Sequence, residues 1–231
     1  MKVNEHNGCN PPFHLAGITI AFSTLLGLMA VSMHPGVANF QTVPAIMSQI
    51  AAYGMHDNFI HGFLILLLAA IASGFSVFGD LLGAHRSAVR FGKIAYLFGY
   101  AAMVSAMLFD GFVVPMIGKK FVNANAVDMQ TAYIVLQAIG AFIQVLTKAG
   151  IIAMSLAFIG WSYALHSSSV MNKWTGKFAL TGYVAGIISV CIILFVDVWL
   201  GPSNLVIIFA VHAIWNFYVA AILLHATKPI D

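Results

Sequence analysis

Ionisable side chains lie inside four of the long apolar segments of this 231-residue chain, where charge is otherwise rare. They are His61, Asp110, Asp197 and His212. Because an ionisable group is costly in hydrocarbon, such residues normally face the interior of a helix bundle and pair with one another. Neutral imidazole is also the commonest protein ligand for transition metals. These residue types therefore predict a shared polar site and make metal binding its first candidate chemistry.

Haem b is one cofactor that such a site would hold. Its iron would bind His61 and His212 as axial ligands from two facing helices, and Gly62 would leave room for the macrocycle. Asp110, or Asn216 one turn after His212, would hold the ring nitrogens that do not bind iron. A haem would make the protein a membrane oxidoreductase or an electron-transport protein.

A single copper, zinc or iron ion is the second option. His56 would join His61 and His212 as nitrogen ligands, and Asp110 or Asp197 would supply a carboxylate. A redox metal would suggest a membrane oxidase or monooxygenase, whereas zinc with an open coordination position would suggest hydrolysis of a lipid-like substrate. A haem- or metal-binding membrane redox protein is our leading hypothesis from the sequence.

A relay of protons or ions would need no cofactor and would indicate a transporter of protons, ions or small solutes. It would use the following residues: His61, Asp110, Lys148, Asp197 and His212. A third reading is a structural subunit in which the polar side chains only join helices. Expected partners are the lipid bilayer, with a quinone, other membrane subunits or a second copy of the chain as further candidates. The small net charge of +3 indicates no nucleic-acid partner.

The composition sets the class of protein. The chain is 61% hydrophobic and only 7% charged, whereas about a quarter of the residues in an average soluble domain are charged. A chain so poor in charge cannot cover a globular surface with polar groups, so we expect an integral membrane protein. Its apolar stretches run near 20 residues without strict alternation, which favours spanning helices over a β-barrel.

We predict a single membrane domain, 1–231, built as an all-α bundle of six transmembrane helices. The spans are about 14–34, 58–79, 91–118, 131–166, 178–200 and 204–225. Residues 37–56 are too polar to span, and the apolar spacing within them predicts a short interfacial helix between spans 1 and 2. Asp57 or Asn58 would then cap the second span.

The segment 131–166 is unusually long. As one helix it would measure about 54 Å, whereas the hydrocarbon core of a bilayer is about 30 Å thick. Either one helix projects well out of the membrane, or a break near Lys148 makes two helices.

The distribution of Lys and Arg separates these alternatives. With six spans, the side that holds both termini carries seven basic residues and the other side carries two. With a break at Lys148 the tally is five against five. The six-span topology with both termini in the cytoplasm is therefore preferred, and we expect the protein in a bacterial inner membrane.

Depth estimates bring the polar residues together in the outer half of the membrane. At 1.5 Å per residue from the predicted helix ends, His61 and Asp197 lie about 6 Å deep, His212 about 12 Å and Asp110 about 13 Å. The outer rim holds His34, His56 and Asp57. One face of 131–166 adds a polar stripe: Tyr133, Gln137, Gln144, Lys148 and Ser155.

Each of these residues also has an ordinary structural reading. Asp57 would be a helix cap, His34 would lie at the interface, and Asp197 would sit at the level of the lipid headgroups. A hydrogen bond between helices would account for His212 and Asp110, which are the deepest of the group. Their convergence from several helices is what favours a functional site.

Overall fold

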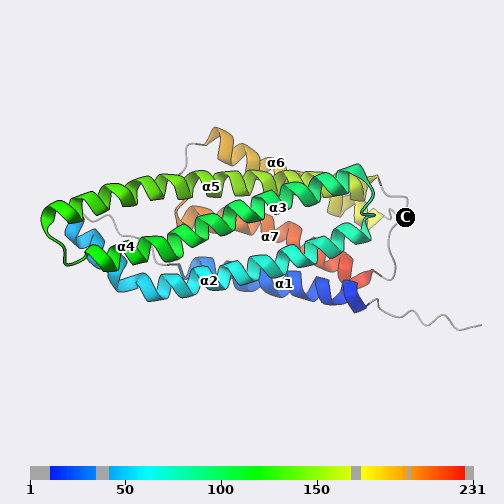
Figure 1. Cartoon of the computed structure of the whole chain (residues 1–231). Helices are drawn as coiled ribbons and strands as arrows, with labels where there is room; N and C mark the ends of the chain where they lie inside the picture. The colour runs from blue at the N-terminus through cyan, green and yellow to red at the C-terminus, as the bar shows by residue number, and fades with distance from the viewer. Residues whose placement is uncertain (1–10, 35–41, 168–172, 197–198, 227–231) are drawn as a thin grey trace, which may run out of the picture.

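The computed structural model describes residues 11–34, 42–167, 173–196 and 199–226, and all regular structure in these ranges is helical. Six of the helical segments are long and apolar enough to cross a membrane (Figure 1). The all-α bundle of six spans predicted from the composition is thereby confirmed, and the chain is a multi-pass integral membrane protein.

The helices follow one another with short connections. In chain order they are α1 (Pro11–Ser32), α2 (Val43–Leu81), α3 (Ser87–Leu108), the π-helical turn η1 (Phe109–Val113), α4 (Val114–Phe121), α5 (Ala126–His166), α6 (Lys173–Phe195) and α7 (Pro202–His225). The elements α3, η1 and α4 form one continuous span, Ser87–Phe121. The less favoured alternative of a break near Lys148 is wrong and the unbroken segment is confirmed, because α5 is a single helix of 41 residues.

Close packing against α3 keeps α5 continuous at Gly150, two residues after Lys148. A Cβ at Gly150 would lie 2.6 Å from the Cγ of Met103 and 3.1 Å from the carbonyl oxygen of Gly99. A Cβ at Gly99 would in turn lie 2.8 Å from the carbonyl oxygen of Gly150. Small residues let two membrane helices approach in this way, so Gly150 serves as a contact point and not as a break.

The prediction of a separate interfacial helix in 37–56 is wrong for the residues that the structure describes, 42–56. Residues from Val43 onward belong to α2, which is one helix of 39 residues. Thr42 is its N-cap, so Asp57 lies in mid-helix and does not cap a span.

Packing against α4 explains why α2 begins so early. A Cβ at Gly54 would lie 3.0 Å from the Cβ of Pro115, and one at Gly118 would overlap the side chain of Ile50. Met47 is completely buried between these helices and α5. The apolar spacing in this stretch therefore belongs to a helix–helix contact and not to a membrane surface.

Three helical segments continue where the other three stop. α1, α6 and α7 contain 22, 23 and 24 residues, whereas α2, the composite span and α5 contain 39, 35 and 41. Figure 1 shows the result: only α2, α4 and the start of α5 reach the left edge of the molecule. We call this the extended end. It has a small core of its own, made of Met47, Met129, Ala132 and Leu136.

Candidate functional site

The turn η1 interrupts the third span at an aspartate and a glycine. A Cβ at Gly111 would overlap the Cβ and Cγ of His61 and would lie 2.8 Å from its Nδ1 atom. Because Gly111 has no Cβ, η1 packs directly on α2 and brings Asp110 beside His61. π-Helical turns are rare and occur frequently at functional sites.

The side chain of Asn58 closes this contact. With its amide nitrogen facing the two carbonyls, it donates to the carbonyl oxygen of Gly54 at 2.5 Å and to that of Gly111 at 2.6 Å. A buried carbonyl without a donor would be costly. Asn58 therefore stabilises both the π-helical turn and its position against α2.

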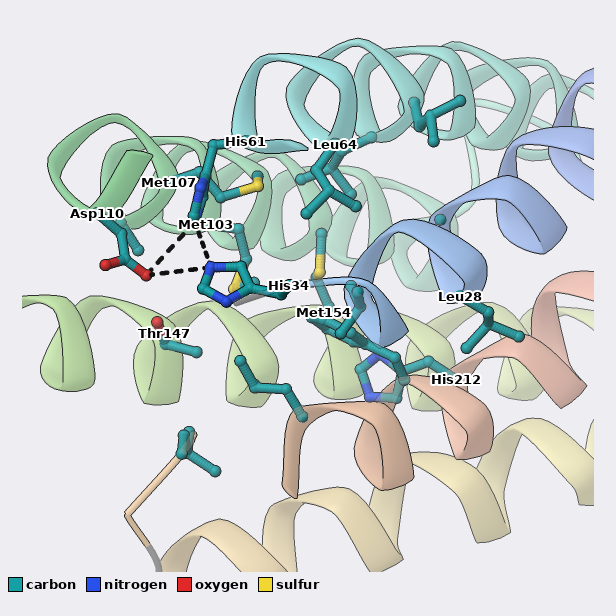
Figure 2. Close-up of a pocket in the computed structure, with 18 of the residues that line it drawn as sticks. Leu28, His34, His61, Leu64, Met103, Met107, Asp110, Thr147, Met154 and His212 are labelled. Atoms are coloured by element: carbon teal, nitrogen blue, oxygen red, sulfur yellow. Dashed lines mark hydrogen bonds and ion pairs between the residues drawn. The ribbon is translucent and has the colours of Figure 1, made fainter. Parts of the chain in front are cut away.

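Four side chains meet at this point, and we call them the His–Asp cluster: His34, Asp57, His61 and Asp110. The Nε2 atoms of His34 and His61 are 3.3 Å apart. The Oδ2 atom of Asp110 lies 3.4 Å from Nε2 of His61 and 3.9 Å from Nε2 of His34. Figure 2 shows these three side chains converging from three different elements. Two imidazoles and a carboxylate thus present their ligand atoms to one point.

Asp57 contacts the other ring nitrogen of His61. Nδ1 of His61 lies 3.0 Å from the backbone carbonyl oxygen of Asp57 and 3.2 Å from its Oδ1 atom. In the tautomer that is protonated at Nδ1, this nitrogen donates to Asp57 and leaves a lone pair on Nε2, directed at His34 and Asp110. Histidines that bind metals are commonly oriented by such a carbonyl or carboxylate.

One carboxylate oxygen of the cluster is not fully satisfied by the protein. Oδ1 of Asp57 is buried and accepts no well-formed hydrogen bond, although Nε2 of His34 lies at 3.4 Å. A buried charge is costly without a partner. A cation, or protons shared among its four members, would complete the cluster.

The cluster lies about one membrane thickness from the opposite end of the bundle. His61 precedes Leu81 by 20 residues, or about 30 Å, and Asp110 follows Ser87 by 23 residues, or about 35 Å. Both residues therefore lie near the level where α1 ends, beside His34. The greater depth predicted for Asp110 from the end of the third span is wrong, because α4 extends that span far beyond the end of α1.

A cavity of about 700 Å³ opens from the cluster into the bundle. His34, His61 and Asp110 line it at the cluster, and Ser23, Tyr96, Asn216 and His212 line it farther along the helices toward the two termini, which we call the deep end. Its wall between these parts is mainly apolar: Leu28, Leu64, Leu67, Leu68, Met103, Met107 and Met154. Figure 2 shows His212 well separated from the cluster, with Met154 beside it. Four of the predicted site residues thus share one cavity, with His61 and Asp110 at one end and His212 and Asn216 at the other.

His212 and Asn216 have partners at the deep end. Nε2 of His212 lies 3.1 Å from the hydroxyl oxygen of Ser155, and its ring packs edge-on against Phe158. The amide nitrogen of Asn216 donates to the hydroxyl of Thr24 at 3.1 Å. Asp110 contacts His34 and His61 instead of His212.

Of the four remaining predicted site residues, three lie outside the cluster and the fourth is not among the described residues. His56 is exposed, with Nε2 3.4 Å from the carbonyl oxygen of Met33. Gly62 faces Phe112 and not the cavity, and Lys148 is half-buried outside the cavity wall that the structure describes. Asp197 lies outside the described residues.

Comparisons of the chain with protein-family models, with curated proteins and with solved structures give no match. Sequence reasoning missed His34 as a member of the site, because it follows the end of α1 and resembles an ordinary interfacial histidine. The sequence signal for the position of the cluster is the pair Asp110-Gly111, an acidic residue beside a glycine in the middle of a span. The cluster and its cavity are the basis of the functional proposal.

Proposed function

We propose that this protein is a membrane metalloprotein that binds one transition-metal ion between His34, His61 and Asp110. The observation that carries the proposal is the triangle formed by their ligand atoms, with sides of 3.3, 3.4 and 3.9 Å. The centre of such a triangle lies about 2.1 Å from each corner, which matches zinc–nitrogen and zinc–oxygen bonds of about 2.0–2.2 Å. A metal ion would thus fit between the three atoms, and a tetrahedral ion would need only the 3.9 Å side to shorten.

Asp57 supports the same assignment. It orients His61 through Nδ1, and its carboxylate together with that of Asp110 would balance the charge of a divalent ion. Asp57 does not line the cavity, whereas the three proposed ligands do. The ion would therefore have protein ligands on one side and an open position toward the cavity, as catalytic zinc sites have.

The lengths of the triangle favour zinc. Ligands of a tetrahedral ion with bonds of about 2.1 Å are about 3.4 Å apart, whereas neighbouring ligands of an octahedral ion are about 3.0 Å apart. Two of the three sides match the tetrahedral value. When bound, zinc would polarise a carbonyl or activate a water molecule, which favours hydrolysis of a lipid-like substrate held in the cavity.

A redox ion is the second candidate, because two histidines and one carboxylate with open positions are also the ligand set of non-haem iron(II) oxygenases. A single ion is preferred to haem. The two axial nitrogens of a haem iron would be on the order of 4 Å apart, and His34 and His61 are closer than this. Haem between His61 and His212 stays a prediction, in which Nε2 of His212 would have to leave Ser155.

The extended end belongs on the outer side of the membrane in this proposal, with both termini in the cytoplasm. The support is the excess of Lys and Arg on the side of the termini, and a bacterial inner membrane fits this topology. Labelling of Lys119 or Lys120 in intact cells by an impermeant amine reagent is expected. Labelling only after the cells are broken would overturn the orientation.

The direct test is the metal content of the purified protein, with an absorption spectrum recorded on the same sample. We expect about one zinc or iron ion per chain in the wild type and none in His34→Ala or Asp110→Ala. His56→Ala is the matched control, because His56 is exposed outside the cluster, and it should keep the ion. A folded, metal-free wild type that regains no ion from zinc or iron solutions would contradict the proposal and favour a proton relay through the same four residues.

A further inference from the structure

The deep end of the cavity carries polar atoms that no described residue satisfies. Tyr96 and His212 are 4% and 6% exposed, and both line the cavity. Nε2 of His212 is engaged by Ser155, but Nδ1 of His212 and the hydroxyl of Tyr96 have no hydrogen-bond partner among the described residues. Neither atom is fully enclosed by protein, so water or a ligand in the cavity can satisfy it.

Ser23 adds a third group of the same kind. Its side chain is 5% exposed and lines the cavity, and its hydroxyl also has no partner among the described residues. Three helices, α1, α3 and α7, thus each contribute one polar side chain to the lining of the cavity. Nothing in the proposed metal site uses them.

The rise per residue gives the separation between this deep polar group and the cluster. Ser23 precedes His34 by 11 residues, and Tyr96 precedes Asp110 by 14. At 1.5 Å per residue these offsets correspond to about 16 and 21 Å along the bundle. A ligand that reaches both ends must therefore be elongated.

The wall between the two ends suits an apolar chain. It is formed mainly by leucines and by three methionines, Met103, Met107 and Met154, and methionine adapts its shape to irregular ligands. The volume of about 700 Å³ is within the range of roughly 300–1,000 Å³ that encloses most of a drug-sized ligand. A polar molecule would lose its hydration against this apolar wall. A purely apolar molecule would leave the polar atoms of Tyr96 and His212 without hydrogen bonds.

We infer that the cavity binds an elongated, mainly apolar molecule of the membrane with a polar group at each end, one at the His–Asp cluster and one hydrogen-bonded by Tyr96 and His212. This assignment names the substrate class of the proposed metalloprotein and rests on that proposal for the chemistry at the cluster only. The deep end selects a hydroxyl or carbonyl group, because Tyr96 offers a donor and His212 offers a donor or an acceptor according to its tautomer.

The test compares two neutral probes on purified protein, cetyl alcohol and the corresponding α,ω-diol of the same chain length. We expect the diol to bind about three- to tenfold more tightly, the gain of one or two hydrogen bonds. Tyr96→Phe should remove most of this preference without opening a cavity. Tyr163→Phe is the control, because Tyr163 is exposed on α5, and it should keep the preference.

The same comparison in His34→Ala separates this inference from the metal proposal. The preference for the diol should persist there, because His61 and Asp110 can still hydrogen-bond a hydroxyl at the cluster while the deep end is intact. Equal binding of the two probes by the wild type would mean that water satisfies Tyr96 and His212, and it would overturn the inference while leaving the metal site standing. Failure of both probes to bind would overturn it as well. A preference that Tyr96→Phe leaves unchanged would assign the selective contact elsewhere.

Discussion

His61 and His212 are both buried histidines of one cavity, yet their surroundings give them different capacities. His61 is 3% exposed and His212 is 6% exposed. Around His61 lie a second imidazole and two carboxylates at distances of 3.2–3.4 Å. Around His212 lie one hydroxyl and an aromatic ring. Burial alone therefore does not distinguish a candidate metal ligand from a histidine that binds a neutral polar group.

The helices explain this difference. At the outer end of the cavity, α1 stops and η1 interrupts its span, so two irregular segments reach His61 with His34 and Asp110. At the deep end, regular helices surround His212 and offer only side chains on their packed faces. The charged side chains thus lie beside a helix end and a π-helical turn. The neutral hydrogen bonds form between regular helices.

Removal of His61 should have the largest effect on this comparison. His61→Ala removes a proposed ligand, and we expect metal affinity to fall by more than about 100-fold, beyond the 10–100-fold typical of outer partners. His212→Ala should leave metal affinity unchanged. Calorimetric titration of the metal-free variants with zinc measures both affinities. Equal losses in the two variants would mean that the two histidines share one site.

Asp57→Asn tests whether the orientation of His61 matters. The substitution keeps the shape of the side chain but removes the charge beside Nδ1, and metal affinity should fall by about 10–100-fold. Asp80→Asn is the matched control, because Asp80 pairs with Lys93 away from the cavity. The same zinc titration applies. An unchanged affinity in Asp57→Asn would assign the orientation of His61 to the backbone carbonyl alone.

Gly111→Ala tests the close approach of η1 to α2. The new Cβ would overlap His61, and crowding of this kind typically costs about 1–3 kcal/mol. We expect a lower midpoint of thermal unfolding in detergent and weaker metal binding. Gly27→Ala is the control, because a Cβ at Gly27 meets nothing within 4 Å, and its stability should be unchanged or higher by up to about 1 kcal/mol. Equal stability of the two variants would contradict the packing described for η1.

Ser155→Ala should have the smallest effect. It removes the partner of Nε2 of His212, and such a hydrogen bond between membrane helices contributes about 0.6–1.5 kcal/mol. Unfolding in detergent should show a loss of that size with no change in metal content. A loss of metal in this variant would mean that the deep end of the cavity affects metal binding at the cluster, which would contradict the separation described.

The composition was sufficient to predict six spanning helices, and the positions of His61 and Asp110 within them predicted a polar site. Hydropathy reports which residues avoid water, so it finds spans reliably. It could not find the start of α2, because residues from Val43 to Gly54 are helical through contacts with α4 and not through membrane burial.

The members of the cluster were harder to predict for a related reason. The depth of Asp110 can be estimated from the end of the third span only if that end lies at the membrane surface. α4 extends the span past that surface. The π-helical turn leaves no mark in hydropathy, since it changes the direction of Asp110 but not the apolar character of the span. His34 is adjacent to residues outside the described ranges, and only the fold brings it to His61.

Binding of one ion by His34 and His61 together is tested most directly by X-ray absorption at the metal edge of the purified, metal-loaded protein. We expect two imidazole nitrogens and one carboxylate oxygen at about 2.0–2.2 Å. We also expect one imidazole fewer in whatever ion His34→Ala still binds at high metal concentration. A spectrum without imidazole scattering, or two imidazoles retained in His34→Ala, would contradict the claim that His34 and His61 bind one ion together.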